Sequence, residues 1–109
     1  MFKVVYEVVI RGLPEEQLCI SRVRDSLMSS GSECVGHQLM LLCSSGEVMI
    51  KLTPFTDQRM SIQPQMFREI TYPQLYVVIE GVKAGDVVRI ADLIYKGLRE
   101  CGIALKLLT

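Results

Sequence analysis

The sequence predicts an α+β domain of the ferredoxin-like class, a split β-α-β plait with an antiparallel sheet and two helices on one face. Two observations predict it. Closely similar apolar runs open the two halves of the chain, Val8-Val9-Ile10-Arg11-Gly12-Leu13 and Val77-Val78-Ile79-Glu80-Gly81-Val82. Each run precedes a helical pattern that ends at a glycine, Gly31 or Gly102, and a further apolar run follows. Two right-handed β-α-β units of this kind place both helices on the same side of the sheet.

The first half begins with a long strand, predicted for residues 2–11 because they are rich in β-branched side chains. Pro14-Glu15-Glu16 predicts a helix start, since proline needs no hydrogen-bond partner there and acids favour the positive end of the helix dipole. This helix is expected to end at Gly31. Apolar residues follow it at helical spacing: Ile20, Val23 and Leu27.

Two strands are then predicted, over residues 34–43 and 47–53, with Ser44-Ser45-Gly46 as the turn of an antiparallel hairpin. The second half repeats the opening pattern. A strand over 74–81 leads through Lys83-Ala84-Gly85-Asp86 into a helix, and 103–108 form the last strand. The apolar stripe of that helix is continuous: Val87, Ile90, Ala91, Ile94, Leu98 and Cys101.

The segment 54–73 breaks this pattern with three prolines, and we expect an insertion that packs on the body of the domain. So long a connection in a small domain is commonly functional. Methionine adapts to irregular surfaces and is frequent where partners bind. We therefore predict a partner-binding patch made of methionines and neighbouring apolar residues: Met49, Met60, Ile62, Met66 and Phe67.

Composition limits the function classes. A chain of 109 residues forms one domain, 1–109, with one core. Half the residues are hydrophobic, and 12 Lys and Arg balance 12 Asp and Glu, which excludes disorder and disfavours nucleic-acid binding. Apolar content without net charge favours self-association. Because no apolar run reaches the roughly 18 residues of a membrane helix and no signal peptide is recognisable, we expect a cytoplasmic protein.

Nothing in the sequence indicates catalysis, a metal or a cofactor. The four cysteines lack C-x-x-C spacing and fall on apolar positions, so free, buried thiols are expected for Cys19, Cys34, Cys43 and Cys101. On one strand Cys34 and His37, the one histidine, point to opposite faces and cannot share a metal ion. Glu15, Glu16 and Asp86 stand at helix starts, where capping and the dipole explain them.

Two segments resemble known families. Val8-Val9-Ile10-Arg11-Gly12-Leu13-Pro14 resembles the first strand of the RNA recognition motif. Residues 45–52, however, lack the aromatic side chains on which that family stacks bases, and we reject this family. Gly85, Val87 and Ile90, with Cys101-Gly102-Ile103 behind them, resemble the strand-loop-helix of ACT-type regulatory domains. That resemblance implies a small-ligand site at Gly85 and Asp86 and a dimer interface.

These observations favour a non-enzymatic protein-interaction or regulatory module. We expect a homodimer that binds a protein partner through the sheet face or edge and the 54–73 insertion. Two alternatives stay open. One is an ACT-like ligand-binding domain, and the other is a nucleic-acid-binding domain that would use the basic residues Arg11, Arg22, Arg24 and Lys51.

Overall fold

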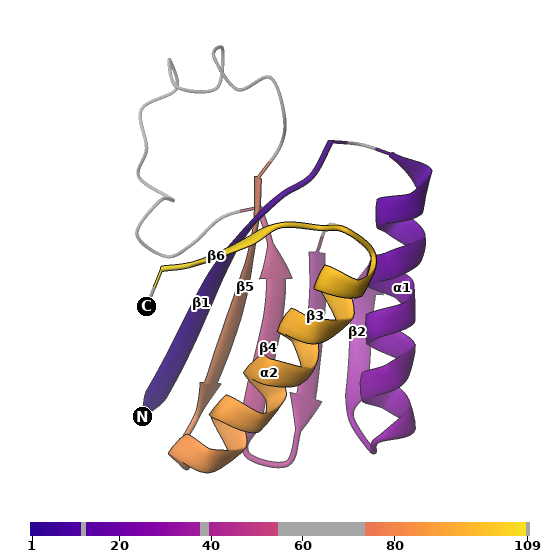
Figure 1. Cartoon of the computed structure of the whole chain (residues 1–109). Coiled ribbons are helices and arrows are strands. Elements are labelled where there is room, and N and C mark those ends of the chain that lie inside the picture. Colours follow the sequence, from indigo (N-terminus) through magenta and orange to yellow (C-terminus); the bar gives the residue numbers. More distant parts are fainter. Residues whose placement is uncertain (12, 38–39, 55–73, 109) are drawn as a thin grey trace.

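A computed structural model describes residues 1–11, 13–37, 40–54 and 74–108 (Figure 1). These residues form two helices and six strands. In chain order they are β1 (Phe2–Val9), α1 (Pro14–Ser29), β2 (Glu33–His37), β3 (Met40–Ser45), β4 (Val48–Thr53), β5 (Gln74–Gly81), α2 (Ala84–Glu100) and β6 (Leu105–Leu107). The segment 55–73, which holds nearly all of the predicted insertion, lies outside the described residues.

The strands form one sheet in the order β2-β3-β4-β5-β1-β6, and every neighbouring pair is antiparallel. Both helices lie on the same face of this sheet, with α2 across its centre and α1 beside β2 (Figure 1). The predicted α+β class with two helices on one face is therefore confirmed. The strand order departs from that of a four-stranded plait, because β3 and β4 lie between β2 and β5.

The prediction of one strand over 34–43 is wrong, because the chain reverses inside this segment. β2 and β3 form a hairpin in which Cys34 pairs with Cys43 and His37 with Met40. The chain reverses between His37 and Met40, and close to this point Gly36 has a φ of +106°, a conformation that residues other than glycine rarely adopt. A Cβ at this position would collide with the carbonyl oxygen of Met40. The predicted hairpin at Ser44-Ser45-Gly46 is confirmed by the pairing of β3 with β4.

Both helices end as the glycines predict, and they end in the same way. After α1, the Gly31 amide donates to the carbonyl of Met28 and the Ser32 amide donates to that of Leu27. After α2, Gly102 and Ile103 donate to Arg99 and Leu98 in the same pattern. The two glycines have φ values of +102° and +81°. These are Schellman motifs, in which glycine takes the left-handed conformation that terminates the helix.

The main core lies between the helices and the sheet. α1, β4, β5 and α2 supply most of it, and the predicted apolar stripe of α2 is buried from Val87 to Leu98. Alternate residues of the strands face the opposite side of the sheet. A second, small buried cluster lies there, formed by Val5, Tyr76 and Val78.

The cysteine prediction is wrong as well. Cys19 is bonded to Cys101, and Cys34 is bonded to Cys43, so none of the four is a free thiol. Cys34 and Cys43 face each other across the β2–β3 hairpin that the sequence reading missed. Cys19 and Cys101 lie 82 residues apart, and only the packing of α1 on α2 brings their Cα atoms to 6.1 Å.

Candidate functional site

The open face of the sheet, opposite the helices, carries exposed apolar side chains near the β2 edge. They are Val35, Met40, Leu42 and Met49, with 65%, 51%, 39% and 41% of their surfaces exposed. We call these four residues the β2–β4 patch. Their strand neighbours Cys34, Leu41, Cys43 and Ile50 contribute to the main core, which fixes the patch on the opposite face.

The register brings the patch residues together. Val35 lies opposite Leu42, and Leu42 lies opposite Lys51. Met40 is two residues from Leu42 on β3, and Met49 is two residues from Lys51 on β4, so both point to the open face as well. Four neighbouring exposed apolar side chains on three adjacent strands form a continuous surface, and surfaces of this kind mark interaction sites.

The open face also carries charged side chains, most of them in cross-strand pairs. Lys51 continues the row to Val78 and Val5, two residues of the small buried cluster. Farther along, β1 pairs opposite charges in register, Lys3 with Glu80 and Glu7 with Lys106. Each such cross-strand pair stabilises a sheet by about 0.2–1 kcal/mol. Charges also border the patch, because Glu80 lies opposite Met49 and Lys51 lies opposite Leu42.

The patch also reaches an edge of the sheet. Among the described strands β2 is the last on its side, so one row of its backbone groups has no neighbouring strand. An edge of this kind is a template for pairing with another strand. Its five residues, Glu33 to His37, include Val35, the most exposed member of the patch.

Of the predicted partner-binding residues, the structure places Met49 in the β2–β4 patch. Met60, Ile62, Met66 and Phe67 lie outside the described residues. Sequence reasoning did not single out Val35, Met40 or Leu42, because it treated 34–43 as one strand. The glycine within that apolar run was the available signal, since an isolated glycine in a strand commonly marks a bulge or break.

The residues predicted for an ACT-like ligand lie in the first turn of α2. Gly85 is the second residue of this helix, and a Cβ added there would meet nothing within 4 Å. Asp86, half-buried, follows it in the first turn, where a negative charge is favourable near the helix N-terminus. Gly85 therefore occupies helix and not a loop, and no close contact requires a glycine at this position.

The four basic residues proposed for nucleic acid do not share a surface. Arg22 and Arg24 are on α1, where Arg24 contacts Asp25 with 3.3 Å between guanidinium and carboxylate atoms. Arg11 precedes α1 and pairs with Glu16. Lys51 projects from β4 on the open face, away from the helices. Arg11 and Arg24 are partly balanced by carboxylates, and the sheet lies between α1 and Lys51.

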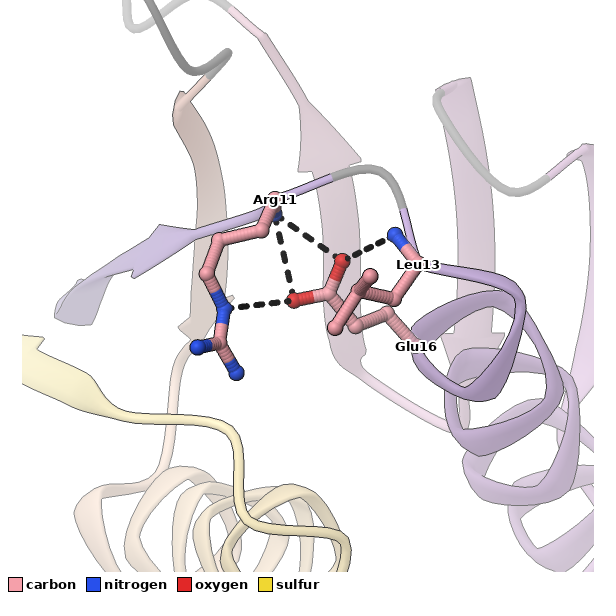
Figure 2. Close-up of polar contacts among 3 residues, drawn as sticks. All are labelled: Arg11, Leu13 and Glu16. Atoms are coloured by element: carbon pink, nitrogen blue, oxygen red, sulfur yellow. Dashed lines mark hydrogen bonds and ion pairs between the residues drawn. The ribbon is translucent and has the colours of Figure 1, made fainter.

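Glu16 is the buried carboxylate of the described chain, with 4% of its surface exposed, and Figure 2 shows what holds it. Its two carboxylate oxygens accept hydrogen bonds from the backbone N–H of Arg11 at 2.9 and 3.1 Å, and one accepts from Leu13 at 2.9 Å. The Arg11 Nε atom lies 3.7 Å from Oε2. Glu16 thus caps α1 and fixes the loop before it, which is the structural role that its position in the sequence predicts.

Tyr6 is the titratable side chain whose environment is most altered. Its hydroxyl lies 3.5 Å from the Ala91 carbonyl, to which it donates, and its ring lies 5.8 Å from that of Tyr95. Burial, followed by the charge of Asp92 and by Tyr95, raises the pKa of Tyr6. No nucleophile or base accompanies it in these contacts. Nor do the described ranges contain a group of three His, Cys, Asp or Glu residues placed to hold a metal ion.

Comparison with known proteins adds no assignment. No family model, no curated protein and no solved structure matches this chain. Within the described part of the chain, neither helix is long and apolar enough to cross a membrane. The β2–β4 patch and the β2 edge are the surface features of the described chain that bear on function.

Proposed function

We propose that this chain is a non-enzymatic protein-interaction module that forms a homodimer through the β2 edge and the β2–β4 patch. The observation that carries the proposal is the coincidence of an unpaired edge strand with four exposed apolar side chains. The 54–73 segment, with Met60, Ile62, Met66 and Phe67, remains part of the proposed partner contact.

A second copy of the chain is the occupant that this geometry favours. Two copies of one edge strand pair antiparallel about a twofold axis, so each residue of the interface meets its symmetry mate on equal terms. The two β2–β4 patches would then adjoin across the axis and form one larger apolar surface for a protein partner. Because the net charge of the chain is zero, the copies do not repel each other.

Two finer points belong to the same proposal. We propose that the sheet derives from a ferredoxin-like plait, in which β6, β1, β5 and β4 form a four-stranded unit and the β2–β3 hairpin extends it. We also propose a cytoplasmic location, which rests on the sequence. In the cytoplasm both disulfides must persist in a compartment where cysteines are usually kept reduced.

The test is the oligomeric state, measured by light scattering coupled to size exclusion at several concentrations. Val35→Lys introduces a charge into the patch and onto the edge, and we expect it to convert the dimer into a monomer. Val88→Lys is the matched control, because Val88 is a valine of similar exposure, 61% against 65%, on α2. It should leave the dimer intact, and circular dichroism should show both variants folded.

Other results would remove the proposal. A wild-type chain that stays monomeric at high micromolar concentration contradicts the dimer. Absorbance at 260 nm that co-elutes with the protein and falls with salt would favour the nucleic-acid alternative and Arg11, Arg22, Arg24 and Lys51. A thermal shift with amino acids or nucleotides that Gly85→Val abolishes would favour the ACT-like alternative.

A further inference from the structure

The Cys19–Cys101 disulfide is the covalent link between α1 and the end of α2. Cys19 is on α1, with 1% of its surface exposed, and Cys101 is the half-buried residue that follows α2. Apart from Cys19, the buried residues of α1 are Glu16, Ile20 and Leu27. Glu16 bonds to the loop that precedes its own helix. α1 therefore buries fewer aliphatic residues in the core than α2, which buries Val87, Ile90, Ala91, Ile94 and Leu98.

An apolar cavity of about 40 Å³ lies beneath α1. Ile20, Val23, Arg24 and Leu27 of α1 line one side, and residues of α2 and of four strands line the others. Cys43 belongs to that lining, and Cys19 directly precedes Ile20. The side chains of α1 thus leave space above the sheet, in contrast to the close packing of protein interiors.

We propose that the Cys19–Cys101 pair is a redox-active site, whose substrates are dithiols and disulfides, and that its reduction releases α1 from α2. In the first step a thiolate of the dithiol attacks Cys101 Sγ, the more accessible sulfur, and forms a mixed disulfide while Cys19 leaves as thiolate. The second thiol of the dithiol then displaces Cys101 and closes its own disulfide. Two electrons and two protons pass from the dithiol to the protein, which ends with two thiols.

The site already holds an acceptor for the reduced form. Cys19 Sγ and Cys101 Sγ each lie 3.6 Å from the carbonyl oxygen of Gly97. A disulfide has no hydrogen to donate, but each thiol formed on reduction can donate to this oxygen, which has two lone pairs. After reduction Cys101 keeps this partner within α2 and its cap, while Cys19 keeps it as long as α1 lies against α2, so the reduced domain can close again.

The second disulfide provides the internal control. Cys34 and Cys43 are 9 residues apart and lie opposite each other in a hairpin whose backbone pairing continues on both sides of them. Breaking this bond leaves the same strands adjacent. Breaking Cys19–Cys101 removes the covalent link between two separate helices. A reductant should therefore convert both pairs to thiols, but only reduction of Cys19–Cys101 should change how a helix is held on the domain.

The experiment is amide hydrogen exchange measured by mass spectrometry, on the full chain, with and without dithiothreitol as the dithiol. We expect reduction to raise exchange in α1 at least tenfold, with α2 and the sheet still protected. The Cys34→Ser/Cys43→Ser variant should show the same response. Cys19→Ser/Cys101→Ser should show fast α1 exchange in both conditions and no further change with dithiothreitol.

Two variants, each lacking one cysteine of the pair, test which of the two sulfurs is more accessible to thiol–disulfide exchange. Cys19→Ser leaves Cys101 as the partner for oxidised glutathione, and Cys101→Ser leaves the buried Cys19. We expect the mixed disulfide to form at least tenfold faster on Cys101, as followed by mass spectrometry.

Three results would overturn the proposal: unchanged α1 exchange after complete reduction, loss of protection throughout the chain, or cysteines that stay reduced in oxidised glutathione. Unchanged exchange would mean that α1 needs no latch, and global loss would make the bond a structural staple. α1 and the β2–β4 patch lie on opposite faces of the sheet, although α1 also lies beside β2, the strand at the proposed dimer edge.

Discussion

The two helices have nearly the same length, 16 and 17 residues, yet they are attached to the sheet in different ways. α2 buries five apolar residues on one stripe, namely Val87, Ile90, Ala91, Ile94 and Leu98. α1 buries two ordinary aliphatic residues, Ile20 and Leu27, together with a cysteine and a carboxylate. Burial of one aliphatic side chain contributes roughly 1.5–3 kcal/mol. Both helices are held by the hydrophobic effect, but α1 buries fewer aliphatic residues and adds one covalent bond to α2.

The strongest way to break this comparison is to remove each disulfide in turn. In the chain-entropy model, a link over 82 residues stabilises by about 4.5 kcal/mol and one over 9 residues by about 2.5 kcal/mol. Cys19→Ser/Cys101→Ser should therefore lower the free energy of unfolding more than Cys34→Ser/Cys43→Ser does. Urea unfolding of both variants checks this order, and equal losses would contradict the special dependence of α1 on its bond.

The acidic residues at the two helix starts give the second contrast. Glu16→Ala removes the carboxylate that accepts from the Arg11 and Leu13 amides, and we expect a loss of roughly 1.5–3 kcal/mol in the free energy of unfolding. Glu16→Gln keeps an acceptor oxygen and should lose less. Asp86→Ala, in the first turn of α2, removes a dipole interaction of about 0.3–1 kcal/mol. Thermal unfolding of the three variants measures the contrast, which fails if Asp86→Ala costs as much as Glu16→Ala.

How far the sequence predicts this difference depends on the kind of contact. Periodicity indicated the stripe of α2, because each of its residues is apolar and points the same way. The glycines at 31 and 102 indicated both helix ends, because only the left-handed conformation satisfies those last carbonyls. The disulfides were not predicted, because the cysteines were interpreted as free, buried thiols of a cytosolic protein, and their spacing does not show which elements adjoin.

The open face shows the same limit. Local alternation within residues 47–53 is enough to place Met49 on the face opposite Val48, Ile50 and Leu52. The rest of the β2–β4 patch depends on the register of β3 against β2, because the chain reverses between His37 and Met40. Local patterns predict which side of an element is apolar, but pairing between elements determines which of those sides adjoin.

The contact between the helices can be tightened or loosened at one position. A Cβ added to Gly97 would lie 2.9 Å from Cγ2 of Val23 on α1. Alanine improves helix propensity by about 1 kcal/mol, but the stiff valine cannot move aside without shifting α1. We expect Gly97→Ala to lower stability by about 1 kcal/mol despite the propensity gain. Val23→Ala makes room, so the double mutant should be more stable than the sum of the two single changes implies.

The smallest expected effect concerns α2 alone and appears at alkaline pH. Tyr6 donates to Ala91 of α2, and burial, Asp92 and Tyr95 raise its pKa above the ordinary value of 10.0. Because the folded state favours the neutral phenol, this contribution is complete below pH 10 and is lost as pH rises through the raised pKa. Tyr6→Phe should remove the loss of stability that ionisation of Tyr6 causes at alkaline pH. Urea unfolding between about pH 8 and 11 measures this loss. Exchange of α1 should be the same in both proteins across that range. A Tyr6→Phe variant with the full alkaline loss would show that another group, away from the α2 contact, carries it.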